Sequence, residues 1–169
     1  MSDATQSSPS MPIYADRNSG ETFPDATTMV NAYLMRFADR AQLRDGEGHR
    51  LQPVLDEGGF VQVQRGSATI GVNVLEDQGV LMVFSPIMAV PAEGREAFYR
   101  RLLELSFVTT SDAAFAINTA RDEVVVRCLR RTSALDYEEF EDILATVGEV
   151  ADRWDDELIR DHGGAGPAA

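Results

Sequence analysis

The order of the fold is decided by residues 79–144, which read GVLMVFSPIMAVPAEGREAFYRRLLELSFVTTSDAAFAINTARDEVVVRCLRRTSALDYEEFEDIL. The apolar run at its start predicts a strand, and the amphipathic stretch 95–107 predicts a helix. Two short apolar segments, 114–118 and 123–129, predict a pair of strands joined by a tight turn. A leucine followed by acidic residues at 135–140 predicts the start of a long helix. No catalytic motif interrupts this order, so the question of function turns toward binding.

The residues before this stretch continue the pattern. Apolar residues recur at spacings of three and four over 25–43, which predicts an amphipathic helix. Residues 60–64 and 68–74 predict two strands, and in the second one apolar and polar residues alternate. Short turns between consecutive strands imply an antiparallel meander. The sequence therefore predicts an α+β fold with an antiparallel sheet of about five strands and three helices in the order α-βββ-α-ββ-α.

The chain of 169 residues is expected to form one domain, over residues 24–161. Residues 1–23 are rich in Ser, Thr, Asp, Pro and Gly, which predicts a disordered N-terminal tail. Residues 162–169 are expected to form a flexible C-terminal tail. Neither a signal peptide nor an apolar run approaching the roughly 20 residues of a membrane span is present, so we expect a cytoplasmic protein without membrane insertion.

The charge of the chain narrows the classes of partner. Asp and Glu together number 28, and all 15 basic residues are arginine, which gives a net charge of −13. Binding to DNA, RNA or anionic lipid depends on basic surface and is therefore not expected. An acidic protein instead attracts basic segments of other proteins.

Candidate catalytic and metal-binding residues do not form a recognisable set. The two histidines, His49 and His162, have no histidine or cysteine at the spacing of metal ligands. No glycine-rich loop follows a strand in the nucleotide-binding pattern, and no serine has a nucleophile-elbow context. We therefore expect no enzyme activity, no metal and no cofactor.

The last predicted helix has an apolar stripe and a strongly acidic opposite face. Residues 136–161 contain 11 acidic residues and 2 arginines. Such a face is either only solvated or an electrostatic surface for a basic partner. In the second interpretation, Asp152, Asp155 and Asp156 contact the partner. Because their spacing lacks the central glycine of a calcium loop, we do not expect them to hold a cation.

The helix predicted at 95–107 has apolar residues over a wider arc than the roughly 100° that a surface helix of a monomer needs. Two interpretations remain open. The helix is either buried within one chain, or it contacts the sheet on one side and a second copy on the other. The second interpretation predicts a dimer interface made of Phe98, Tyr99, Leu102, Leu103 and Leu105.

The joint order of these elements resembles the type III secretion chaperones and the related YbjN-like domains. The resemblance spans residues 25–160. It is carried by Leu81–Pro86, by Pro91 with the paired leucines Leu102 and Leu103, by Phe115–Ile117, by Leu135–Phe140 and by Ala151–Trp154.

This resemblance implies a small acidic homodimer that binds an extended segment of a partner protein, either an effector-like or an assembly protein. The segment would dock apolar side chains into shallow patches or add a strand to a sheet edge. The first helix would supply one patch through Tyr33 and Phe37. The alternative is a structural or regulatory assembly component of the YbjN-like group, which binds a folded partner without a role in secretion. The family has no catalytic motif to carry over.

Overall fold

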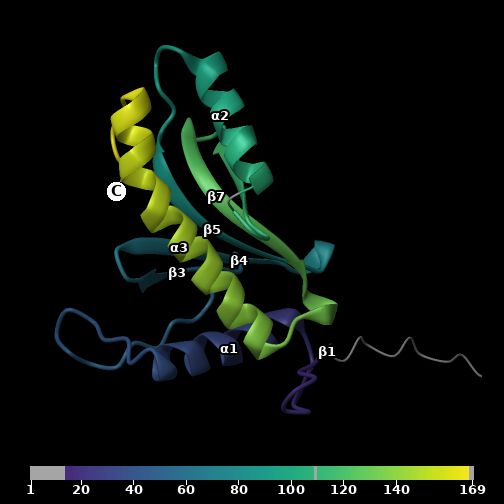
Figure 1. The fold of residues 1–169 in the computed structure, drawn as a ribbon. Coiled ribbons are helices and arrows are strands. Elements are labelled where there is room, and N and C mark those ends of the chain that lie inside the picture. The colour runs from purple at the N-terminus through teal and green to yellow at the C-terminus, as the bar shows by residue number, and fades with distance from the viewer. Residues whose placement is uncertain (1–13, 109, 168–169) are drawn as a thin grey trace, which may run out of the picture.

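The structure, a computed structural model, describes residues 14–108 and 110–167. A five-stranded sheet has the order β3-β4-β5-β7-β6, and a separate hairpin pairs β1 with β2 (Figure 1). The elements are β1 Tyr14–Ala15, β2 Thr22–Phe23, α1 Ala26–Arg40, β3 Phe60–Arg65, β4 Ala68–Leu75, η1 Glu76–Gln78, β5 Val80–Ala89, α2 Arg95–Val108, β6 Ala114–Asn118, β7 Glu123–Arg131, η2 Thr132–Ala134 and α3 Tyr137–His162. The predicted α+β class and the predicted order of three helices and five sheet strands are confirmed.

All neighbouring strands of the large sheet are antiparallel. The register places Val72 opposite Val83 and Val74 opposite Leu81, so these side chains share one face. All four are at most 4% exposed. The alternation read from the sequence of β4 therefore marks the face of the sheet that enters the core.

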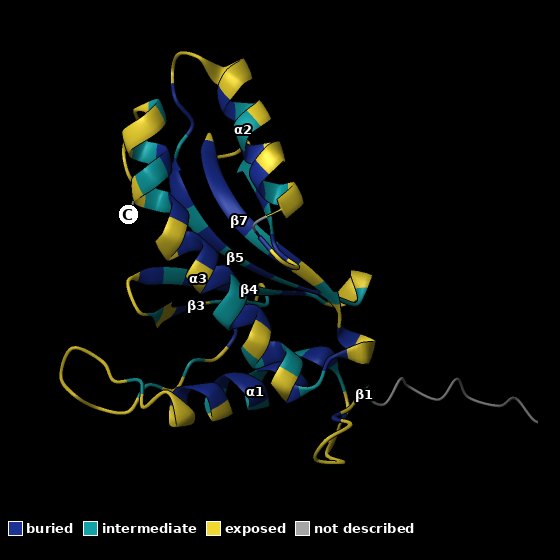
Figure 2. Ribbon diagram, viewed as in Figure 1, coloured by how far each residue is buried: buried dark blue, intermediate teal, exposed yellow. Residues whose placement is uncertain are grey.

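The helices cover this buried face. α3 crosses the sheet diagonally (Figure 1), and its Gly148 lies so close to the sheet that an added Cβ would be 3.4 Å from Ile70 Cδ1. α2 lies over β6 and meets α3, where Arg101 Cζ is 5.7 Å from the centre of the Trp154 ring. In Figure 2, strands β5 and β7 are largely buried, whereas the outer side of α2 is exposed. The core therefore lies between one face of the sheet and the inner sides of the helices.

Strand β5 is longer than the sequence predicts. The apolar run at residues 80–84 predicts the strand, but β5 continues through Pro86 to Ala89. The register with β7 shifts between Pro86 and Met88, which is a β-bulge. Because proline has no N–H for a regular ladder, a bulge is a position at which a strand accepts it.

Residues 14–23 differ from the disordered tail expected over residues 1–23, of which residues 1–13 lie outside the described residues. They form the β1–β2 hairpin, in which Asp16 is 1% exposed and Phe23 is 5% exposed. The Asp16 carboxylate accepts hydrogen bonds from the Tyr33 hydroxyl (2.8 Å) and the Tyr137 amide (2.9 Å). Contacts to distant helices thus position a segment whose own composition resembles a flexible one.

The C-terminal residues also contact the domain. α3 extends to His162, whose ring centre lies 5.0 Å from that of Phe98 on α2. Beyond the helix, the carbonyl of Ala165 accepts a hydrogen bond of 3.0 Å from the amide of Ala89 on β5. Within the expected flexible tail of residues 162–169, residues 162–165 therefore have specific contacts, and 168–169 lie outside the described residues.

Candidate functional site

Helix α2 has two apolar sides, and the structure divides the predicted dimer residues between them. Phe98, Leu102 and Leu105 are at most 5% exposed and belong to the core of their own chain. Leu103 is 72% exposed, and Tyr99 is half-buried on the same outer side. The wide apolar arc in the sequence therefore contains an inner face that packs on the sheet and an outer face that remains accessible.

The outer face of α2 consists of Tyr99, Leu103, Phe107 and Val108. Phe107 is 88% exposed and Val108 is 71% exposed, so both belong to this face although they were not among the predicted interface residues. Glu96, Arg100 and Glu104 border the same shallow depression. The spacing of four between residues 99, 103 and 107 is the sequence signal for this side of the helix. A contiguous exposed apolar surface framed by charged residues is typical of a protein-interaction site.

The two edges of the sheet differ in accessibility. β6 forms one edge, and the amide of Phe115 donates a 3.0 Å hydrogen bond to Ser106 Oγ of α2. β3 forms the other edge and pairs only with β4. Since unpaired backbone groups at a sheet edge can accept another strand, β3 is the more open edge for strand addition.

Tyr33 and Phe37 do not form the exposed patch that was expected on the first helix. They are 2% and 4% exposed, because the apolar stripe of α1 packs against the core of the domain. The Tyr33 ring makes an edge contact with Tyr137 at 5.7 Å. Burial and the neighbouring Asp16 carboxylate raise the pKa of the Tyr33 hydroxyl above its usual range. Both residues therefore have a structural role.

Asp16 is the acceptor at the centre of this buried contact. Burial alone would raise the pKa of its carboxyl group, but hydrogen bonds from the Ser19 and Tyr137 amides and the Tyr33 hydroxyl hold that pKa well below its usual range. The ionised carboxylate thus joins the hairpin to α1 and to the first residue of α3. This network belongs to the stability of the fold.

Asp152 and Asp155 lie at a groove, whereas Asp156 is an exposed residue on the same helix outside it. We call this the β4–β5 groove; it is lined by Gln62, Gln64, Thr69, Arg121, Asp152 and Asp155, with Pro86 and Pro167 at its border. Ser67 Oγ donates a 2.6 Å hydrogen bond to Asp152. Two of the three predicted acidic partner residues are therefore brought together with polar groups of the sheet.

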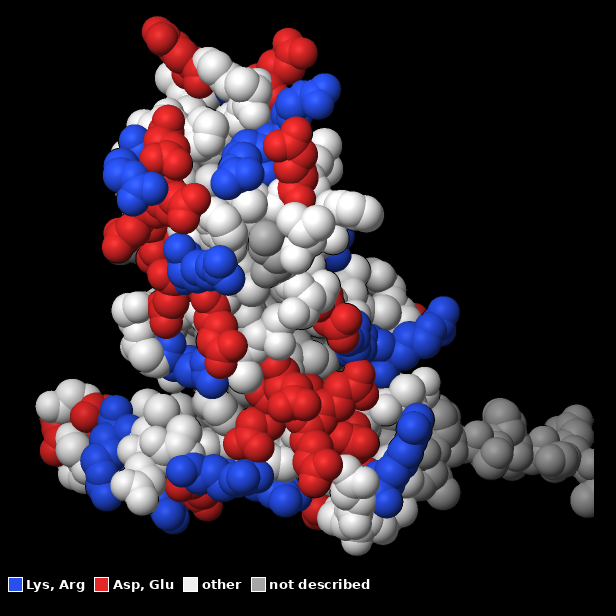
Figure 3. All heavy atoms as spheres, viewed as in Figure 1, with Lys and Arg blue, Asp and Glu red and all other residues white. Residues whose placement is uncertain are grey.

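Acidic side chains gather elsewhere around the start of α3. The lower half of the molecule in Figure 3 has a continuous acidic region, and Asp112, Asp136, Glu138, Glu139 and Asp142 line a depression there. Arg130 forms ion pairs with Asp112 and with Glu139, the latter at 2.7 Å. This region is negative on balance, and the arginine neutralises only part of its charge.

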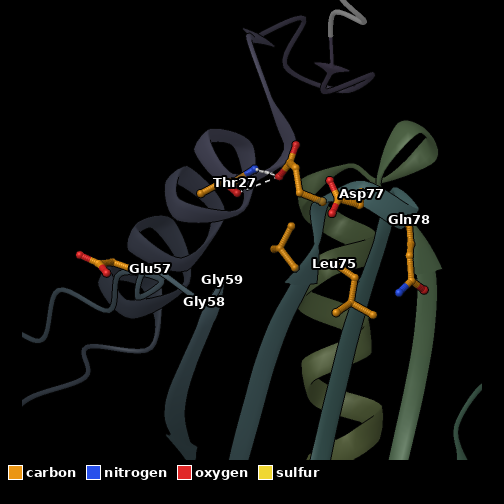
Figure 4. A pocket seen from close by; sticks show the side chains of 9 residues that line it. Thr27, Glu57, Gly58, Gly59, Leu75, Asp77 and Gln78 are labelled. Carbon is orange, nitrogen blue, oxygen red and sulfur yellow. Dashed lines mark hydrogen bonds between the residues drawn. The ribbon is translucent and has the colours of Figure 1, made fainter.

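A further depression lies between η1 and the start of α1 and is lined in part by Glu57, Glu76 and Asp77; Figure 4 shows Glu57 pointing away from Asp77. The Glu76 carboxylate accepts hydrogen bonds from the amides of Ala26 and Thr27, each at 3.1 Å, and from Thr27 Oγ1 at 2.8 Å. It thereby satisfies free donors at the start of the helix. The geometry of Glu76 is explained by helix capping.

Two features are absent from residues 14–108 and 110–167. These residues contain no group of three or more His, Cys, Asp or Glu side chains arranged to hold a metal ion. Within the same ranges, no helix has the length and apolar character that crossing a membrane requires.

Comparison with solved structures identifies proteins of the same fold. A chain of the ExsC–ExsE complex superposes with a TM-score of 0.63 at 24% identity, covering 79% of this chain and 96% of that one. A chain of the HopA1–SchA chaperone–effector complex gives 0.60 at 8% identity, with coverages of 78% and 96%. A chain of the ExoU–SpcU heterodimer, from the type III secretion system of Pseudomonas aeruginosa, gives 0.54 at 16% identity, with coverages of 77% and 97%.

Among curated proteins, no sequence matches the chain. A family profile does match it. The profile of one family matches residues 27–168, which is nearly all of the domain. The resemblance seen in the order of elements is thereby confirmed, and the chain belongs to the family described as T3SS (YopN, CesT) and YbjN peptide-binding chaperone 1.

Proposed function

We propose that this protein is a non-catalytic chaperone or adaptor that binds, as a cytoplasmic homodimer, an extended segment of a partner protein. Membership of a peptide-binding chaperone family supports the class of ligand. One of the structures with the same fold is a chaperone–effector complex, which supports an effector-like or assembly protein as the partner. The observation that carries the homodimer is the outer face of α2.

The outer face of α2 is suited to pairing with its own copy. Leu103 and Phe107 are the most exposed large apolar side chains of the described residues, and they lie one helical turn apart. Fully burying such a side chain contributes roughly 1.5–3 kcal/mol, so covering this face in both copies supplies a substantial driving force. The inner residues Phe98, Leu102 and Leu105 then hold the helix on the sheet.

The test is the mass of the protein in solution. Leu103→Asp and Phe107→Asp each place a carboxylate in the proposed contact, where its desolvation without a partner is unfavourable. We expect light scattering to give the mass of a dimer for the natural chain and the mass of a monomer for both variants, with unchanged circular dichroism. Val54→Asp is the matched control, since Val54 is 56% exposed but lies outside α2. A monomeric natural chain, or dimers that persist in both α2 variants, would contradict the proposal.

A further inference from the structure

Strand β5 extends beyond its pairing with β4. The register between these strands ends at Gly71 and Phe84, whereas the register with β7 continues to Ala89. At the point of separation, Ser85 Oγ donates a 2.9 Å hydrogen bond to the carbonyl of Thr69 on β4. No strand of the described residues therefore pairs with the side of β5 that faces away from β7 over residues 85–89, where Ser85, Ile87 and Met88 are at most 1% exposed.

The C-terminal segment, residues 163–167, lies on this unpaired edge of β5. The amide of Ala89 donates to the carbonyl of Ala165 at 3.0 Å, while the next amide, that of Val90, donates to the carbonyl of Asp122 at 2.8 Å. This alternation of amides between two sides is the pattern of a strand with a neighbour on each side. The edge thus already donates a main-chain hydrogen bond to a segment that is not part of the sheet.

Among the described residues, the C-terminal segment makes few other contacts with the domain. Gly164 has a φ of +131°, and an added Cβ would lie 2.7 Å from Met88 Cε, so this position requires glycine. At Gly166 an added Cβ would meet open space. A chain of small residues with one hydrogen bond to β5 is readily displaced, because one such bond contributes only about 0.5–1.5 kcal/mol.

The β4–β5 groove begins at this part of β5, and its lining is polar and acidic. α3 contributes Asp152 and Asp155, and the turn between β6 and β7 contributes Arg121, so the carboxylates outnumber the guanidinium group. Gln62, Gln64 and Thr69 add amide and hydroxyl groups. An extended segment on β5 that carries arginine or lysine is complementary to these carboxylates.

We propose that residues 85–89 of β5 and the β4–β5 groove bind an extended, arginine- or lysine-bearing segment of a partner protein, and that the C-terminal segment competes for this edge. The inference rests on the proposed function for the existence of a peptide partner. The segment then binds at β5, carries positive charge and must displace the C-terminal segment.

The competition is tested first in the protein without a partner. Gly164→Val forces a branched side chain into a strained backbone position against Met88, which we expect to release the C-terminal segment from β5. Gly166→Val changes the same segment where space is open. Hydrogen exchange of the Ala89 amide, measured by NMR, should accelerate in Gly164→Val and remain as in the natural chain in Gly166→Val. Equal exchange in all three proteins would overturn the competition.

Binding is tested with a short fluorescein-labelled peptide that alternates valine with arginine, and with a matched peptide that has glutamate in place of arginine. We expect the arginine peptide to bind Gly164→Val roughly threefold to tenfold more tightly than the natural chain, the change that corresponds to one main-chain hydrogen bond. We expect Asp152→Asn with Asp155→Asn to weaken binding, and Asp156→Asn to leave it unchanged. Binding of neither peptide, equal binding of both, or an equal effect of Asp156→Asn would overturn the site.

The peptide site and the homodimer are tested by different substitutions. Leu103→Asp and Phe107→Asp change the outer face of α2, and Gly164→Val changes the edge of β5, so each set serves as a control for the other. If the α2 variants become monomeric and still bind the arginine peptide, the homodimer and the peptide site both stand and are independent. If the mass follows the proposed function but no variant binds the peptide, only the inference about β5 fails.

Discussion

A single carboxylate, that of Asp16, connects three segments of the chain. It accepts amide hydrogen bonds from Asn18 and Ser19 in its own turn, and it also accepts from Tyr33 and Tyr137. Asp16 is 1% exposed, and its bonds from Tyr33 and Tyr137 are buried, whereas those from Asn18 and Ser19 lie at the exposed turn. Because hydrogen bonds to a buried ionised group are stronger than neutral ones, Asp16 fastens the N-terminal hairpin to α1 and α3.

Replacing Asp16 by asparagine should therefore lower the free energy of unfolding at neutral pH by about 1.5–3 kcal/mol, the usual contribution of hydrogen bonds to a charged group. The folded pKa of Asp16 is depressed below its ordinary value of 3.8. The stabilisation is then fully present above that value and is lost as the pH falls toward the folded pKa. Urea unfolding at a series of pH values should show the natural chain and Asp16→Asn converging in strongly acidic solution.

Asp156→Asn is the control for this pH series, because Asp156 is exposed and its replacement makes the same change of an acid to an amide on the surface. A difference between the natural chain and Asp16→Asn that stays constant with pH would contradict the assignment. The sequence did not predict this role. The Tyr33 and Tyr137 partners are 17 and 121 residues away, and a turn rich in Asp, Asn, Ser and Gly is equally common in disordered segments.

At the scale of elements, α2 shows how far the sequence alone predicts the two sides of a helix. The apolar arc over residues 98–107 is wider than one packed face requires, which left open a helix buried within one chain or a helix with a second apolar contact. The sequence did not predict which side faces the sheet. That choice depends on how α2 lies over β6 and against the end of α3, where Phe98 meets His162.

Two adjacent leucines of α2 should therefore respond differently to the same change. Leu102→Asp buries a carboxylate in the core, where Leu102 is 5% exposed, and should lower the free energy of unfolding by about 3 kcal/mol or more. Leu103→Asp should leave the monomer folded, because Leu103 is 72% exposed. Thermal melting followed by circular dichroism at low protein concentration separates the two. Equal melting temperatures would mean that the two faces of α2 are assigned incorrectly.

The start of α1 offers a second test at this scale. Glu76 of η1 caps the helix from a distant part of the sequence by accepting from Ala26 and Thr27. Loss of such a cap costs about 1–2 kcal/mol, so Glu76→Ala should lower the free energy of unfolding in urea by that amount. Asp77→Ala, the next residue of the same turn, is the control. An equal loss in both variants would indicate a general charge effect in place of capping.

At the scale of the whole molecule, the N-terminal hairpin belongs to the domain. Deleting residues 1–23 removes Asp16 and Phe23 and exposes the aromatic contacts of Tyr33, whereas deleting residues 1–13 retains the hairpin. We expect the longer deletion to have a clearly lower melting temperature than the shorter one. Equal melting temperatures would show that the hairpin contributes nothing to stability.

The order of helices and strands was predictable because each element has its own periodicity and its own turn residues. The alternation in β4 and the apolar spacing of α3 both fix a buried face without reference to the rest of the chain. The burial of Tyr33 and Phe37, the edge of β5 and the position of the C-terminal segment depend on packing between distant elements. Local sequence patterns do not define these contacts between distant elements. The site predicted at Tyr33 and Phe37 is therefore buried in the core.

The contact between α2 and α3 has an optical consequence. Trp154 is the single tryptophan of the chain and is 5% exposed. Its indole N–H has no hydrogen-bond partner among the described residues, and Arg101 of α2 lies over its ring. Fluorescence excited selectively at tryptophan therefore originates at the junction of these two helices, and we expect the short-wavelength emission of a buried indole. Any partner or second copy that shifts α2 will change this emission, so association can be followed with no dye attached.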